Sequence, residues 1–545
     1  MAPPTSRGHH GLPSLTNLGT NPMESFEGAT HTEVVPRSLL VALVLAGSTA
    51  ASAAAQGTTV GPAGASTAPL RVADALGAAL QANPSVRASL FEVVVAREAT
   101  RATENARTPV FRASMDGTYR ESFSGTADGA VLNDARSVTA GLGLDWTSEV
   151  GTTISIDLST SASWRTVNRD PSTTTSYAIG PNYDTQLLAT VRQPLMRGRG
   201  RDVTLASERS ARAGAEAARA NRDLAVSGVI RDLLSAYWEL WYAERALEVQ
   251  RGAEALAEQQ LREATAQVAL GTLAPAERLR FASELASLRE TRRTAELTVA
   301  TQRFTLAQLL AADADGLSVD PEVPAVPTLG ELRVLLEKAE RSSPEILALD
   351  ATLEQARQSA LSARDATRAQ VDLVGSAGMV TLWADDSLPG LQLPTGRPGF
   401  IVSGGLEIEL PLGSSAADAQ RAQAEAQLEV AQAQRQVGTL TVRTAVLSAY
   451  ESAVTAAERI PLAAESASVA EELATAERGR LELGTSTPSV LVEAQQDARE
   501  AELRRLRALV DAMVAVRDLE HTAGVLLDRF SLRGSAGLSE VRDAG

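Results

Sequence analysis

An internal duplication with constant spacing limits what this chain can fold into more than any other feature of its sequence. Ser235-Ala236-Tyr237 recurs as Ser448-Ala449-Tyr450, 213 residues later. Leu270-Gly271-Thr272, followed by Pro275, recurs as Leu483-Gly484-Thr485, followed by Pro488, at the same separation. Because the separation does not change, both copies keep the same helical register between these landmarks. The sequence therefore predicts two copies of one structural unit.

Landmarks further upstream show that the first copy is longer than the second. Gln193-Pro194-Leu195 corresponds to Leu410-Pro411-Leu412 at a separation of 217, and Asn83-Pro84 corresponds to Ser343-Pro344 at 260. The first copy thus carries 43 additional residues between these two landmarks. A proline-rich stretch, Asp320 to Pro327, is the natural linker. We assign repeat 1 to residues 70–319, the linker to 320–328, repeat 2 to 329–525 and a C-terminal tail to 526–545.

Each copy is expected to begin with a helix and to end with a long helical hairpin. The first helices cover Arg71 to Arg107 and Gly330 to Arg368, and Pro84 and Pro344 should break or restart them. The hairpins cover residues 200–312 and 414–525. Aromatic residues make up only 3% of the 545 residues, while Ala, Gln and Glu fill these stretches, which favours a coiled-coil-like bundle over a thick globular core. Gly271 and Gly484 fit helix C-termini, and Pro275 and Pro488 fit the first turns of the returning helices.

Between these helices, each copy contains segments in which apolar and polar residues alternate. In repeat 1 they lie within about 110–195, with windows near 110–120, 137–147, 150–164 and 184–195; in repeat 2 they lie within about 371–411. Alternation over about ten residues is typical of membrane-barrel strands. Nine of the 19 aromatic rings fall within residues 109–195 and 372–410, as expected where interfacial aromatic girdles anchor a barrel. A soluble sandwich is the alternative. One copy of the chain has too few strands to close a barrel, so a barrel would need several protomers.

The N-terminus resembles an export signal. Ser38 to Ala46 is a short apolar run preceded by Arg37, and Ala53-Ala54-Ala55 offers a small-residue cleavage site. We therefore assign residues 1–55 to a signal peptide with a long n-region, or one that starts at Met23, and 56–69 to an N-terminal tail. A buried core helix is the alternative for the apolar run.

Composition argues against several classes of function. The formal net charge of −16 disfavours nucleic-acid binding. The chain has no cysteine, and of its four histidines only His521 follows the cleavage site. We therefore expect no enzyme activity, no catalytic residues, no cofactor and no metal site. Gly198-Arg199-Gly200 lacks the third glycine of a phosphate-binding loop. The Tyr237-Trp238-Trp241-Tyr242 cluster is expected to pack between helices.

The duplicated Ala-Tyr pairs, the duplicated Leu-Gly-Thr turns and the strand-to-helix junctions at Gln193-Pro194-Leu195-Met196-Arg197-Gly198 and Leu410-Pro411-Leu412-Gly413 resemble those of the TolC-like outer-membrane efflux proteins. The resemblance covers roughly Pro69 to Gly524. It implies long α-helical hairpins plus membrane strands in a duplicated protomer, with three protomers sharing one outer-membrane β-barrel and one helical tunnel through the periplasm. It also implies a passive exit duct that works with a periplasmic adaptor protein and an energised inner-membrane transporter.

The resemblance also suggests site residues. The turns at Gly271, Thr272, Pro275, Gly484, Thr485 and Pro488 would form the tip that docks the adaptor; the alternative is that they are simple connections between helices. Glu277 and Glu493 would constrict the tunnel mouth, where six carboxylates in a trimer would attract cations; the alternative is a solvated helix face. Arg197, Arg199 and Arg201 could meet lipid headgroups or could lie at an exposed junction.

Two points of the sequence remain open. Simple members of the family have two strands per copy, whereas repeat 1 has four windows. Its additional hairpin either belongs to the barrel wall or stands outside it. For function, the alternative to an exit duct is a periplasmic coiled-coil adaptor or scaffold, which would be expected to have a single hairpin between soluble β-domains. The transported substrate leaves no motif that identifies it.

Overall fold

A computed structural model of the chain describes residues 69–126, 129–168, 176–323, 325–384, 399–410, 412–413, 415–530 and 532. All of them belong to one compact unit, Gly64–Gly545. The expected signal peptide at 1–55, residues 56–68 of the tail that follows it, and residues 533–545 lie outside the described part of the chain.

Both repeats begin with a pair of helices separated at a proline. In repeat 1 these are α1 (Val72–Ala82) and α2 (Pro84–Asn105), and in repeat 2 they are α6 (Leu332–Ser342) and α7 (Pro344–Ala366). The Asn83 side chain caps α2 by accepting a hydrogen bond from the Ser85 backbone N–H at 2.9 Å, and it donates to the carbonyl of Leu309 at 2.9 Å. Proline lacks a backbone N–H, so it fits the first turn of a helix but not its interior. The prediction that Pro84 and Pro344 restart the helices is confirmed.

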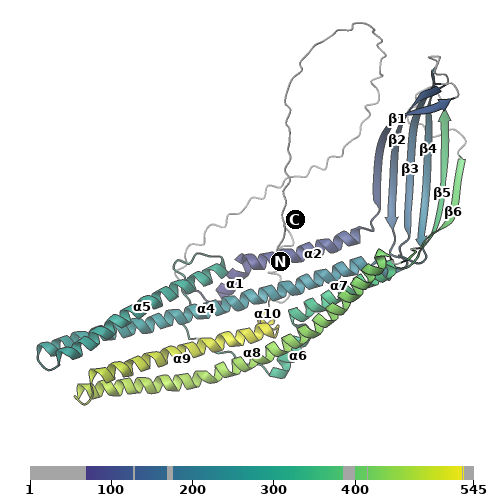
Figure 1. Cartoon of the computed structure of the whole chain (residues 1–545). Coiled ribbons are helices and arrows are strands. Elements are labelled where there is room, and N and C mark those ends of the chain that lie inside the picture. Colours follow the sequence, from purple (N-terminus) through teal and green to yellow (C-terminus); the bar gives the residue numbers. More distant parts are fainter. Residues whose placement is uncertain are drawn as a thin grey trace, which may run out of the picture. The chain divides into compact units, whose positions relative to one another are not determined.

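Each repeat ends in a long antiparallel hairpin (Figure 1). In repeat 1, a short helix α3 (Arg201–Thr204) precedes α4 (Ala206–Ala269), and α5 (Pro275–Leu310) returns along α4. In repeat 2, α8 (Ala416–Glu482) pairs with α9 (Pro488–Thr522), and a short α10 (Leu526–Arg529) follows. Across the repeats, α4 also packs against α7 and α9. Among the described residues, none of the helices is both long and apolar enough to cross a membrane.

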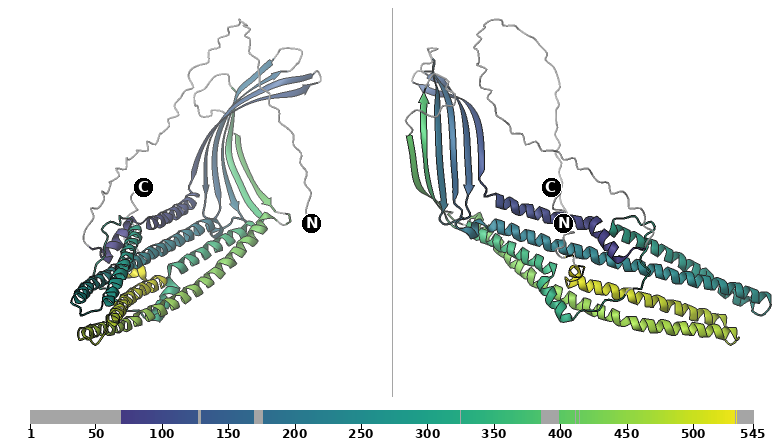
Figure 2. Two further views of the ribbon diagram at one scale, coloured as in Figure 1. Left: turned by 60° about the vertical axis from the view of Figure 1, so that its left-hand side comes forward. Right: turned by 180° about the vertical axis from the view of Figure 1, so that it is seen from behind.

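The strands of both repeats form one antiparallel sheet in sequence order (Figure 2). Repeat 1 contributes β1 (Val110–Thr126), β2 (Gly129–Thr147), β3 (Thr153–Asn168) and β4 (Ser176–Pro194). Repeat 2 contributes β5 (Gln370–Ala384) and β6 (Gly399–Glu409). The additional hairpin of repeat 1 therefore lies within the sheet, paired on both sides, and does not stand apart from it.

The two faces of this sheet differ in character. One row of paired residues across all six strands is entirely apolar, and so is the next row on the same face. The first row is Phe111, Leu144, Ile156, Ala189, Ala377 and Val402; the second is Ala113, Leu142, Leu158, Leu187, Met379 and Phe400. Phe111 is 69% exposed and Val402 is 82% exposed, so this face is not the interior of a soluble sandwich.

The main hydrophobic core lies among the helices. Tyr237, Trp238 and Trp241 of α4 are buried there together with side chains of α1, α2, α5, α9 and α10, which confirms the expected packing of the aromatic cluster. The Tyr237 hydroxyl donates to the carbonyl of Leu70 at 2.9 Å, and Leu70 in turn bridges to Val319 after α5. The core thus binds the first residues of repeat 1 to its last.

The fold class predicted from the sequence is confirmed: long helical hairpins are combined with antiparallel strands in a duplicated protomer.

Candidate functional site

The two hairpin turns are stereochemical copies of each other. Gly271 has φ 74° and Gly484 has φ 73°, both in the left-handed region that favours glycine. The Thr272 N–H donates to the carbonyl of Gln267 at 3.0 Å, and the Thr485 N–H donates to that of Arg480 at 2.8 Å. Each threonine hydroxyl donates to the same carbonyl, at 3.0 Å in both turns. These are Schellman endings, in which glycine allows the chain to reverse and the last carbonyls of the helix stay bonded.

The tip (the turns 270–275 and 483–488) is largely exposed in the protomer. Leu270 is 79% and Leu483 is 80% exposed, far more than a leucine in a packed connection. Pro275 begins α5 and is exposed, whereas Pro488 begins α9 and is buried. Two exposed leucines beside polar turn backbone form a surface that another protein can cover.

Three side-chain contacts join the end of one hairpin to the end of the other. Arg280 of α5 donates to the Ser489 hydroxyl of α9 at 2.6 Å, Gln260 of α4 donates to Gln495 at 3.1 Å, and Arg499 donates to Glu284 at 3.5 Å. None of these residues was singled out from the sequence, because an arginine or glutamine on a charged helix face carries no signal of its partner. These contacts join the two hairpins close to their turns.

Glu277 and Glu493 have different surroundings. Glu277 lies in the first turn of α5, partly exposed, with one carboxylate oxygen 3.7 Å from Arg280 Nε. Glu493 lies on an exposed part of α9. Arg280 therefore links Glu277 to Ser489 on the second hairpin, so Glu277 belongs to the seam between the hairpins, while Glu493 is exposed in the protomer.

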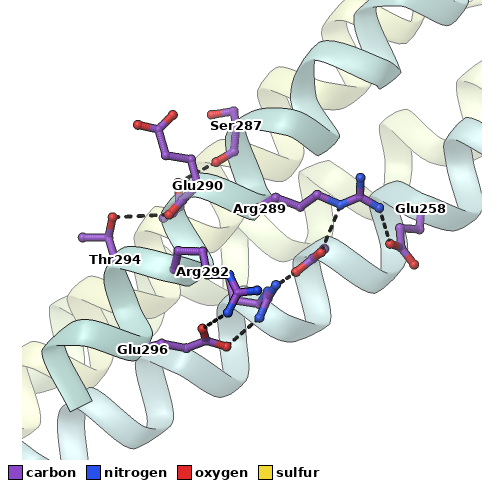
Figure 3. A network of polar contacts seen from close by, with 10 residues as sticks. Glu258, Ser287, Arg289, Glu290, Arg292, Thr294 and Glu296 are labelled. Carbon is purple, nitrogen blue, oxygen red and sulfur yellow. Dashed lines mark hydrogen bonds and ion pairs between the residues drawn. The ribbon is translucent and has the colours of Figure 1, made fainter. Parts of the chain in front are cut away.

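Further along the first hairpin from the tip, two arginines of α5 bind glutamates of α4 (Figure 3). Arg289 donates to Glu258 at 2.7 Å and to Glu254 at 3.3 Å. Arg292 lies 2.5 Å from Glu254 and 2.5 Å from Glu296. Shared carboxylates in such a network hold the two helices in register, although exposed ion pairs contribute little to stability.

Glu477 supports the turn of repeat 2. It accepts hydrogen bonds from the Ser486 hydroxyl at 2.7 Å and from Arg480 at 2.6 Å. The Ser486 hydrogen bond, and to a smaller extent Arg480, lower the pKa of this buried carboxyl, against the effect of its burial. The carboxylate thus fastens the residue after Thr485 to the last turns of α8.

The polar face of the sheet carries charged clusters near the ends of the strands that join the helices. Arg112 of β1 lies 2.6 Å from Asp145 of β2 and 3.7 Å from Asp157 of β3. Arg192 of β4 lies 2.8 Å from Asp372 of β5 and 2.6 Å from Glu407 of β6. Sequence analysis missed these clusters, since their members are separated by up to 215 residues and only the sheet register brings them together.

The junction between β4 and α3 is held by specific contacts. Arg197 bonds to Gln370 and lies 3.6 Å from Glu409, Arg199 donates to the carbonyl of Leu195 at 3.4 Å, and Arg201 lies 2.7 Å from Glu149. The Gly198 N–H donates to the buried Asp365 carboxylate at 2.6 Å. The Gly198-Arg199-Gly200 backbone is therefore a structural turn.

His521 lies on α9 and forms a hydrogen bond with Ser227 of α4 at 2.7 Å. Burial, and to a smaller extent the neighbouring Arg231, lower the pKa of its imidazole. Within the part of the chain that the structure describes, no group of three or more His, Asp or Glu side chains is arranged to hold a metal ion.

Comparison with known proteins gives a consistent picture. Residues 335–525 match the family model described as outer membrane efflux protein. No curated protein matches the sequence. The structure is similar to the outer membrane protein VceC of Vibrio cholerae, with a TM-score of 0.61 and 17% identity over 83% of this chain and 96% of that one.

Two further solved structures have the same fold. The open-state MtrE outer membrane channel of Neisseria gonorrhoeae gives a TM-score of 0.60 and 18% identity over 84% of this chain and 89% of that one. A membrane protein from Pseudomonas aeruginosa gives a TM-score of 0.62 and 20% identity over 83% of this chain and 93% of that one. The resemblance inferred from the duplicated motifs is thus confirmed by the family match in repeat 2 and by the fold across both repeats.

Proposed function

We propose that this chain, which carries the sequence signature of the outer membrane efflux proteins and the fold of their channels, is the outer-membrane exit duct of an efflux or secretion system. Three copies share one β-barrel in the outer membrane and one helical tunnel that extends into the periplasm.

One observation carries this proposal: the exposed apolar face of the six-stranded sheet, directly continued by long helical hairpins. In water such a face would aggregate, whereas in a bilayer it would contact lipid. Its two edge strands would leave backbone groups unpaired in lipid, so a lone protomer cannot be the membrane-inserted form. Association of several copies satisfies both requirements.

The duct is passive in this proposal. The features that support this are the paired helices and a sheet whose polar face carries arginine–carboxylate clusters. Energy would come from an inner-membrane transporter, which a periplasmic adaptor connects to the tip. Gly271, Thr272, Pro275, Gly484, Thr485 and Pro488 are the proposed docking surface, and Glu277 and Glu493 are the proposed charges of the tunnel mouth.

A periplasmic adaptor or scaffold is the second candidate. The exposed apolar rows favour the duct, because an adaptor in aqueous periplasm has no use for an uncovered apolar sheet. The presence of two complete hairpins also fits the duct better than the single hairpin expected of an adaptor.

Fractionation combined with electrical recording tests the proposal. The full chain, expressed with its own N-terminus, should sediment with outer membranes and require detergent for release. When reconstituted in a planar bilayer without nucleotide, it should conduct ions. Recovery in the soluble periplasmic fraction, with no conductance from any detergent extract, would identify the scaffold instead.

A further inference from the structure

The sheet of one protomer has two unpaired edges, β1 and β6, within the described residues. We propose that β1 of each protomer pairs with β6 of the next, so that three protomers close an eighteen-stranded barrel whose wall includes the β2–β3 hairpin. This inference rests on the proposed function. It names the surface by which one copy binds another and sets the width of the duct at the outer membrane.

The β2–β3 hairpin is held in the sheet along both of its strands and at its turn. It is paired with β1 along β2 and with β4 along β3. Its turn is fastened to the β4–α3 junction: the Gly200 N–H donates to the carbonyl of Val150 at 3.2 Å, and Arg201 lies 2.7 Å from Glu149. Gly151 has φ 90°, and a Cβ there would lie 2.3 Å from the carbonyl oxygen of Gly198. Such close packing of the turn against the β4–α3 junction is expected of a hairpin that belongs to the barrel wall.

The hairpin also has the chemistry of the rest of the wall. Its apolar residues continue both apolar rows without interruption from β1 to β6. On the polar face, Arg112 of β1 contacts Asp145 and Asp157 of the hairpin. If the hairpin stood outside the barrel, β1 would have to pair with β4 directly, whereas the observed sheet pairs β1 with β2 and β4 with β3.

The register of the sheet gives a strand tilt that suits a barrel. Successive paired residues lead from Val110, the first residue of β1, through Asp145, Ser155, Thr190 and Ser376 to Ser403 of β6. Ser403 lies six residues before Glu409, where β6 ends. If all strands start from one level, the stagger is about one residue per strand, which corresponds to a tilt of about 35° at strand spacings of about 4.8 Å. Outer-membrane barrels have tilts of about 35–45°.

The same geometry specifies the register between protomers. Placing the start of β1 beside the end of β6 pairs Asp116 with Ser403 of the neighbouring copy. It also keeps the exposed apolar residues of both strands, such as Tyr119 and Phe400, on one face. In this register Arg112 comes opposite Glu407, so opposite charges meet across the interface. Alternation along the strands excludes a slip by one residue, because that would turn every apolar side chain inward.

Closure with eighteen strands makes a wide pore. With a strand spacing of about 4.8 Å and a tilt of about 35–40°, eighteen strands give a backbone diameter of about 35 Å, against about 23 Å for twelve. Barrels of 16–18 strands leave an open aqueous channel. The outer-membrane segment would therefore pass any solute that the helical tunnel admits.

Cysteine cross-linking tests the interface directly, because the chain has no cysteine of its own. The full-length double variant Ser403→Cys/Asp116→Cys, in outer membranes, is treated with a short bifunctional thiol reagent and run on denaturing gels. We expect covalent dimers and trimers. Two controls share Ser403→Cys. The first control combines it with Ser376→Cys. In the wild type the Ser376 and Ser403 hydroxyl oxygens lie 2.5 Å apart within one sheet, so this pair should link only within protomers. Pairing Ser403→Cys with Arg120→Cys, four residues from the proposed partner, should give little product.

Linkage within protomers by the Ser376→Cys control, without linkage between protomers by the Asp116→Cys pair, would overturn the proposed closure. Electron microscopy of the purified wild type gives an independent measurement, with an expected barrel about 12 Å wider than a twelve-stranded one. A membrane trimer with a twelve-strand diameter would refute this inference and leave the proposed function standing. A chain that forms no membrane oligomer would refute both.

Discussion

Replacing the tip glycines with alanine should loosen both turns by a predictable amount. In Gly271→Ala and Gly484→Ala, the new Cβ meets nothing within 4 Å, so no packing clash is added. The cost comes from the backbone alone, because a residue with a Cβ loses roughly 1–2 kcal/mol in the left-handed conformation. This cost falls on the native turn, whose open form does not need a positive φ.

The expected consequence is faster opening of the hydrogen bonds that end α4 and α8. A cost of 1–2 kcal/mol corresponds to roughly a 5–30-fold rise in the open population. Hydrogen–deuterium exchange with mass spectrometry on peptides covering 266–275 and 479–488 should show this rise at the amides of Thr272 and Thr485. Exchange in the sheet and in the helical core should stay unchanged.

Two controls separate backbone strain from other effects. Gly271→Asn should exchange less than Gly271→Ala, because asparagine tolerates the left-handed region. Gly252→Ala, within α4 and with nothing within 4 Å of its Cβ, should slow exchange nearby, since alanine stabilises a helix interior by about 1 kcal/mol over glycine. Equal exchange in Gly271→Ala and wild type would refute the assigned strain at the tip.

Four further outcomes are expected. Trp241→Ala empties a site that is 1% exposed in the helical core, so it should cost about 3–5 kcal/mol and lower the thermal unfolding midpoint more than Trp241→Phe does; equal midpoints would contradict the packing described. Because hydrogen bonds lower the pKa of Glu477, its stabilisation of the second turn should be present above about pH 4.3, the ordinary glutamate value, and be lost as the pH falls through the lowered pKa. After correction for the intrinsic pH dependence of amide exchange, the open population at 479–488 should therefore rise on acidification in wild type and depend less on pH in Glu477→Gln; parallel corrected pH profiles would refute this role. The double variant Gly271→Val/Gly484→Val should still insert into outer membranes but lose adaptor cross-linking and export, whereas unchanged export would make the turns simple connectors. Glu277→Gln/Glu493→Gln should insert normally and show weaker divalent-cation block and lower cation preference in bilayer recordings, and identical behaviour would place these carboxylates outside the lumen.

The helix boundaries and hairpin turns were predictable from the sequence, because each is marked by a local proline or glycine that recurs in both repeats. Pro84 and Pro344 mark helix restarts because proline restricts its own backbone and that of the preceding residue, and Gly271 and Gly484 mark hairpin turns because the left-handed region favours glycine. Alternation identified all the strand windows of repeat 1. It could not say whether the additional hairpin joins the wall, because that depends on pairing with β1 and β4.

The candidate site was less predictable, because its contacts join distant residues. Arg280 gives no local sign that it reaches Ser489 across two hairpins, and Arg192 gives none that it lies between Asp372 and Glu407. Both arginines lie on polar surfaces where many partners are compatible with the sequence. Only the register of helices and strands selects the partner, and that register is set by the apolar residues on the opposite faces.

The most direct test of the account is the mass of the complex extracted from outer membranes. Native mass spectrometry of the full chain, expressed with its own N-terminus and released in mild detergent, should give three times the mass of the mature subunit. The same preparation should conduct ions in a planar bilayer. A monomer of the mature chain, released without detergent and silent in the bilayer, would contradict the central claim that each protomer supplies one third of an outer-membrane duct.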